Sequence, residues 1–136
     1  MKIPGYLGTL TESPWGEQQK YLLIVQSLAD ERQASRAGFI NIFTPSEKVL
    51  SDKELTQELR NLLVASQPNV RKFFLVLHDT PESDQFAVNV FKAFGDLRSI
   101  LWLKPRQGKE FNTFASVLSL LPYTMTRSYW EHFPLN

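Results

Sequence analysis

The side chains best placed for chemistry are His78 and Asp79, which follow the apolar run Arg71 to Leu77. Open α/β sheets bind their ligands at the carboxyl ends of strands. Thr80 and Pro81 begin a helix directly afterwards, and a helix N-terminus favours negative charge nearby. His78 and Asp79 therefore form a candidate ligand site of a small enzyme or a phospho-acceptor domain. The alternative is a structural role, in which Asp79 and Thr80 only cap and orient that helix.

Other catalytic and cofactor-binding patterns are missing from the sequence. The chain has no Cys and only two His, His78 and His132, and these show no metal-ligand spacing. Its six glycines form neither G-x-G-x-x-G nor a Walker-type loop, and no serine lies in a G-x-S-x-G elbow. We therefore expect no catalytic constellation, no cofactor and no metal.

Length and charge limit the class of protein further. A chain of 136 residues fits one domain with a full core, and 15 Lys and Arg against 14 Asp and Glu give a net charge of +1. Such a balance provides no overall field for binding a polyanion. The N-terminus has no signal-peptide pattern, and no apolar run is long enough to span a membrane. A cytoplasmic protein is the simplest interpretation.

The helices and strands that position His78 and Asp79 are predicted from hydrophobic periodicity and from capping residues. A capping box at Ser51 and Glu54 predicts a helix over 52–65, and Thr80 with Pro81 predicts another that stops at Gly95. Residues 29–37 are charged and too few for a full crossover helix, so we expect a long hairpin loop or one helical turn. Strands are predicted at 20–28, 38–43, 71–77 and 99–103, and a further helix at 111–121.

These elements predict a three-layer α/β sandwich with a mixed sheet of about four strands. The strands of 71–103 should form a parallel pair, and those of 20–43 an antiparallel pair. An N-terminal binding arm, 1–19, precedes the single α/β domain, 20–136. The domain ends in an irregular aromatic tail with Tyr129, Trp130 and Phe133, which could cover the core or extend a binding surface.

The arm carries Tyr6, Leu7, Leu10 and Trp15 without the pattern of a helix or a strand. Such side chains either pack onto the protein's own core, as an edge strand or a covering segment, or bind a partner. Trp is enriched among the residues that dominate binding energy. These four residues are therefore candidate partner-binding residues.

Two segments of the chain together resemble the psi subunit of the bacterial DNA polymerase III clamp-loader complex. One is the arm from Tyr6 to Trp15, in which spaced leucines precede a Trp. The other runs from Val70 through Asp79 and Pro81 to Leu103, Lys104 and Pro105, and is similar to the family's central strand, acidic-Pro turn, helix and strand. Thr11 and Glu12 depart from the Gly-Ile of the family's arm, and residues 16–68 are longer than expected.

The resemblance implies a non-catalytic adaptor. Its arm would dock on the clamp-loader motor subunits through Leu7, Leu10 and Trp15. Its α/β body would pair with a chi-type subunit, which contacts single-stranded-DNA-binding protein. The alternative is a small cytosolic α/β enzyme or phospho-acceptor domain that uses Asp79.

Overall fold

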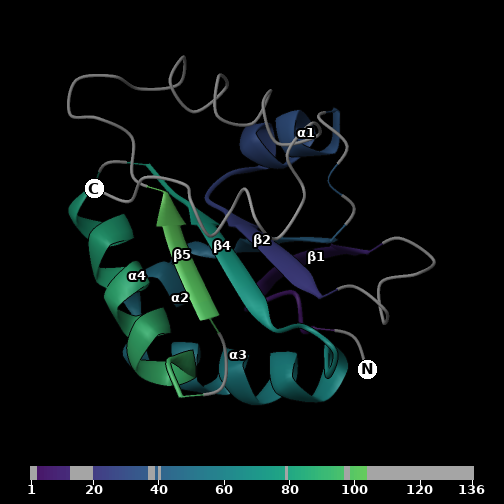
Figure 1. Cartoon of the computed structure of the whole chain (residues 1–136). Helices are drawn as coiled ribbons and strands as arrows, with labels where there is room; N and C mark the ends of the chain where they lie inside the picture. The colour runs from purple at the N-terminus through teal and green to yellow at the C-terminus, as the bar shows by residue number, and fades with distance from the viewer. Residues whose placement is uncertain are drawn as a thin grey trace.

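A five-stranded mixed sheet forms the centre of the protein in the computed structural model (Figure 1). The structure describes residues 3–12, 20–36, 39, 41–78, 80–96 and 99–103. The strands are β1 (Gly8–Glu12), β2 (Tyr21–Val25), β3 (Asn41–Pro45), β4 (Lys72–Val76) and β5 (Ser99–Leu103). Their spatial order is β1-β3-β2-β4-β5, with one strand more than the sequence predicted.

Four of the strands are parallel to one another. β2 pairs in parallel with β3 on one side and with β4 on the other, and β5 continues the sheet in parallel beyond β4. β1 runs antiparallel to β3 along all five of its residues. The chain thus places β3 on one side of β2 and then crosses to the other side for β4. Such a reversal of strand order is the switch point at which doubly wound sheets hold ligands.

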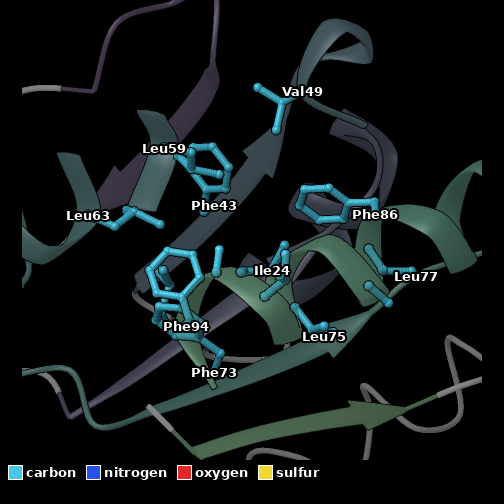
Figure 2. Packing of buried hydrophobic residues seen from close by; sticks show 14 of the residues in the cluster. Ile24, Phe43, Val49, Leu59, Leu63, Phe73, Leu75, Leu77, Phe86 and Phe94 are labelled. Atoms are coloured by element: carbon cyan, nitrogen blue, oxygen red, sulfur yellow. The ribbon is translucent and has the colours of Figure 1, made fainter. Parts of the chain in front are cut away.

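The sheet has one large apolar face, and three helices cover it. The helices are α2 (Glu47–Ser51), α3 (Lys53–Ser66) and α4 (Pro81–Phe94). Both α2 and α3 contact α4, and Figure 1 shows all three on one side of the sheet. Figure 2 shows the core between them, where aromatic rings fill the space that the sheet and helices enclose. Its largest members are Phe43, Phe73, Phe86 and Phe94.

The N-termini of two helices follow from their capping residues. Thr80 is the N-cap of α4 and accepts a hydrogen bond from the Ser83 amide, with Pro81 in the first turn, as predicted. The N-cap of α3 is Asp52, whose side chain accepts from the amides of Glu54 and Leu55. The predicted capping box at Ser51 is wrong, because Ser51 ends α2 instead. Asp can cap one residue later because its carboxylate accepts from two orphan amides at once.

The opposite face of the sheet carries α1 (Leu28–Arg36), which corrects the prediction for residues 29–37. Nine helical residues there let β2 and β3 run parallel, so the predicted antiparallel pair is wrong. Hydrophobic periodicity did not indicate this helix because only Asp30 and Ala34 of α1 are buried, and two such residues make no apolar stripe. Buried side chains of the strands on this face include Leu23, Val25, Ile42, Phe74 and Val76.

Strand β1 also corrects the sequence-based interpretation of the arm. Gly8–Glu12 lies in the sheet as an edge strand, although the sequence indicated neither strand nor helix there. The segment gave no strand signal because a five-residue edge strand with two threonines buries too little for a clear alternation. Residues 3–12, which we call the N-terminal strap, thus continue the α/β body. The predicted helix 111–121 and the aromatic tail lie outside the described residues.

Candidate functional site

The N-terminal strap is fastened to the body through Leu7. The Leu7 side chain is fully buried and belongs to the same core cluster as Phe43 and Val49. A turn precedes it, in which the Leu7 amide donates to the Pro4 carbonyl at 3.0 Å. The Ser46 amide donates to the Leu7 carbonyl at 3.0 Å and so joins the strap to the start of α2. Leu7 is thus an interior residue of the domain while the strap lies on the body.

Tyr6 lies on the outside of the same turn and is 48% exposed. Its hydroxyl donates a hydrogen bond to the Glu58 carboxylate on α3, and its carbonyl accepts from Ser46 Oγ at 2.7 Å. The bond to Glu58 raises the pKa of Tyr6 above 10, with smaller contributions from desolvation and from the Glu58 charge. Tyr6 therefore bridges strap and body at the surface, where a partner can reach it.

Gly8 permits the close approach of the strap to β3. Its φ is +146°, and a Cβ built there would lie 2.3 Å from the Thr44 carbonyl oxygen and 2.9 Å from Pro45 Cα. An L side chain meets both a disfavoured backbone conformation and backbone atoms that cannot rotate away. Gly8 is therefore required for the chain to pass from buried Leu7 into β1.

The other candidate arm residues differ in their surroundings. Leu10 lies directly opposite Phe43 in the β1–β3 register and is partly buried against the core. The neighbouring Thr11 hydroxyl donates to the Glu31 carboxylate of α1. Trp15 lies outside the described residues. Of the four predicted partner-binding residues, the structure thus places Leu7 in the core, Leu10 against it and Tyr6 at the surface.

A second group of polar side chains lies at the switch point between β2 and β4. Ser27 follows β2, and its Oγ accepts from the Asp30 amide at 3.2 Å in the first turn of α1. His78 follows β4, and its Nε2 lies 2.7 Å from Asp30 Oδ2. Asp30 is fully buried, whereas the His78 side chain is 39% exposed. A hydrogen bond thus joins the imidazole to the buried carboxyl group.

Gln26 connects the same two strand ends with α4. Its side-chain oxygen accepts from the His78 amide at 2.9 Å and from the Ser83 hydroxyl. Ser83 is fully buried, and its Oγ also lies 2.8 Å from Thr80 Oγ1. These contacts fix the carboxyl end of β4 between the first turns of α1 and α4. The network orients an imidazole beside a buried carboxylate, an arrangement that catalytic proton-transfer sites also use.

His78, one of the two predicted ligand-site residues, takes part in this network, whereas Asp79 lies outside the described residues. Sequence reasoning missed Asp30, Gln26 and Ser83. No signal marked Asp30, because an acid in the first turn of a helix is ordinarily a solvated residue that favours the dipole. Asp30 Oδ1 is buried without a hydrogen-bond partner, so His78 is the side chain that compensates this carboxylate.

Within the described part of the chain, no three His, Asp or Glu side chains gather closely enough to hold a metal ion. No helix among the described residues has the length and apolar character needed to cross a bilayer.

Comparison with known proteins gives no relative from which to assign a function. No family model matches the chain, and neither does any curated protein or any solved structure.

Proposed function

We propose that this protein is a cytoplasmic, non-catalytic adaptor of the psi type in the bacterial DNA polymerase III clamp loader. Its N-terminal segment would dock on the motor subunits through Tyr6, Leu10 and Trp15, with Leu7 as a further anchor. Its body would pair with a chi-type subunit, which links the complex indirectly to single-stranded DNA. The proposal begins from the resemblance of the arm and of the unit 70–105 to that family.

The observation that carries the proposal is the placement of these two segments in the sheet. The arm contributes β1 at one edge, and the unit 70–105 contributes β4, α4 and β5 at the other edge. Two strands, β3 and β2, separate β1 from β4. Because neighbouring strands lie about 4.8 Å apart, β1 and β5 are about 19 Å apart across the sheet. An adaptor needs two such separate surfaces to hold two partners at once.

Side-chain exposure supports the same division of the surface. At the β1 edge, Tyr6 presents nearly half of its surface beside Glu58. On α4, Val88 is 39% exposed although the helix buries Ala87 and Val90 on its core side. Aromatic residues are enriched in protein interfaces relative to the rest of the surface. We assign the first surface to the motor subunits and the second to the chi-type subunit.

The test is binding of the full chain to purified clamp-loader motor subunits, measured by calorimetry. Intact protein should bind, and Trp15→Ala should weaken binding by about 30-fold or more, as expected for an aromatic anchor. Leu28→Ala is the matched control, because Leu28 is a 58% exposed apolar residue on α1 and not part of the arm. Equal binding by intact protein and Trp15→Ala would refute docking through the arm, and no binding by either would refute the motor subunits as partner.

A second candidate function rests on the switch-point network. There His78, which pairs with Asp30, directly precedes in the sequence Asp79, the group proposed as catalytic or phospho-accepting in the alternative interpretation. Incubation with a small acyl phosphate, followed by intact-mass measurement, tests phosphoryl transfer to this acid. A mass increase of one phosphoryl group that Asp79→Asn abolishes would support this function over the adaptor. An unchanged mass would refute a phospho-acceptor function for this protein.

A further inference from the structure

We propose that the N-terminal strap is a closed state of the docking arm, and that binding to the clamp-loader motor subunits requires β1 to leave the sheet. This inference rests on the proposed function and adds a regulatory step to it. In the free protein, residues 3–12 close over the core of their own domain. In the complex, the same side chains would be transferred to the partner.

The argument begins with the two leucines of the arm. Leu7 is fully buried among core residues, and Leu10 packs against that core opposite Phe43. Leu7, which is surrounded by its own core, has no surface left for a second protein, and the part of Leu10 that packs on the core is covered as well. If Leu7 and Leu10 are docking anchors, their burial in the body and their burial in the partner exclude each other. The body and the motor subunits therefore compete for the same two residues.

The position of the strap allows it to open without unfolding the domain. β1 lies at the edge of the sheet and pairs with β3 alone, whereas β3, β2, β4 and β5 pair in parallel with one another. Removal of β1 therefore breaks no pairing among the other four strands. The remaining contacts of the strap are the buried Leu7 side chain, the Ser46 amide hydrogen bond to the Leu7 carbonyl, the Thr11 bond to Glu31, and the Tyr6 contacts with Glu58 and Ser46 Oγ. Release of β1 is therefore a local opening, which costs less free energy than unfolding of the whole domain.

The competition has a quantitative consequence for affinity. When only the open state binds, the apparent dissociation constant equals the intrinsic one divided by the open fraction. A substitution on the body that loosens the strap, while every arm side chain is kept, should therefore tighten docking. Glu58→Ala removes the acceptor of the Tyr6 hydroxyl and should tighten binding about two- to tenfold, the effect of one ordinary hydrogen bond. Glu54→Ala, an exposed carboxylate one turn earlier on α3, should leave the affinity unchanged.

A reversible disulfide across β1 and β3 gives the sharpest test. Thr9 and Thr44 are direct partners in the antiparallel register, a geometry within reach of a disulfide, and the chain has no native Cys. Thr44→Cys also removes a buried hydroxyl that has no hydrogen-bond partner. The double variant Thr9→Cys/Thr44→Cys, when oxidised, holds β1 in the sheet. The matched control is the same protein after reduction.

The expected result is that the oxidised variant loses at least tenfold in affinity for the motor subunits, and that reduction restores the binding of the intact protein. Circular dichroism of both forms checks that the fold is unchanged. Equal affinity in both redox states would overturn the opening step while the adaptor function stands. If Glu58→Ala weakens docking, the partner recognises the closed strap, which also overturns the inference. No binding by the unmodified protein would refute the proposed function itself.

Discussion

The substitution Leu7→Ala tests whether the N-terminal strap is part of the protein's core. Leu7 has no exposed surface and packs in the main core cluster, so the shorter side chain leaves a cavity. Such buried Leu→Ala changes cost about 3–5 kcal/mol when the surroundings cannot collapse. Because the strap lies at a sheet edge and can shift, we expect about 2–3 kcal/mol. For a domain of this length, that loss lowers Tm by about 10 °C.

Urea unfolding followed by circular dichroism measures this loss directly. The midpoint should fall while the slope m stays that of the intact protein, because the same surface is exposed on unfolding. Leu28→Ala, at a 58% exposed position, is the control and should change stability by less than about 0.5 kcal/mol. If Leu7→Ala unfolds at the same urea concentration as this control, Leu7 is not buried in the free protein. The placement of β1 in the sheet would then be wrong.

Three further substitutions test the contacts around the strap and the switch point. Gly8→Ala should destabilise the protein by about 2 kcal/mol or more in thermal unfolding, because a Cβ meets the β3 backbone at positive φ; stability equal to that of the intact protein would contradict this close approach. The raised pKa of Tyr6 favours its neutral form. The contribution of its bond with Glu58 to folding stability is therefore present below pH 10 and lost as pH rises through the raised pKa. In ultraviolet titration, Glu58→Gln should lower that pKa toward 10, and an unchanged titration would refute the bond. His78→Ala leaves the buried Asp30 carboxylate without its partner and should cost about 1–3 kcal/mol in urea unfolding at pH 7; no loss would show that Asp30 does not depend on His78.

The elements that the sequence predicted well are those whose signals are local. Thr80, Pro81 and Gly95 mark both ends of α4, and each of these signals acts within one helical turn. The parallel pairing of β4 and β5 then follows, because a crossover helix joins them. β5 begins and ends at the predicted residues for the same reason, since it is a short apolar run between polar segments. These parts of the fold were predictable because residues within or next to each element determine its ends.

The elements that the sequence missed depend on long-range contacts. α1 carries Asp30 where an amphipathic helix would carry an apolar residue, and the side chain that contacts its buried carboxyl group is His78, 48 residues later. Leu7, just before β1, is fully buried, and β1 itself is held by its pairing with β3, by Leu10 against the core and by the Thr11 bond to Glu31. None of these contacts leaves a pattern in the adjacent sequence. The direction of β2 relative to β3 was wrong for the same reason, because it depends on α1.

The candidate sites were predictable to different degrees. The end of β4 was identified as a candidate ligand site because His78 follows an apolar strand, and the structure places His78 at the switch point. The strap residues were singled out because their apolar side chains showed no helix or strand pattern. Whether Leu7 faces inward depended on the backbone conformation of Gly8, which a sequence does not specify by itself. Residue type alone did not decide between packing on the protein's own core and binding to a partner, because that choice depends on how the strap packs.

Hydrogen exchange of β1 and β3, with and without the clamp-loader motor subunits, tests the central claim most directly. In the free protein, amides that join β1 to β3 should exchange slowly, because the five residues of β1 are paired. On addition of the motor subunits, β3 amides that face β1 should lose protection while β2 and β4 keep theirs. Fast exchange of β1 in the free protein, or unchanged protection of β3 in the complex, would contradict a strap that closes the body and opens onto its partner.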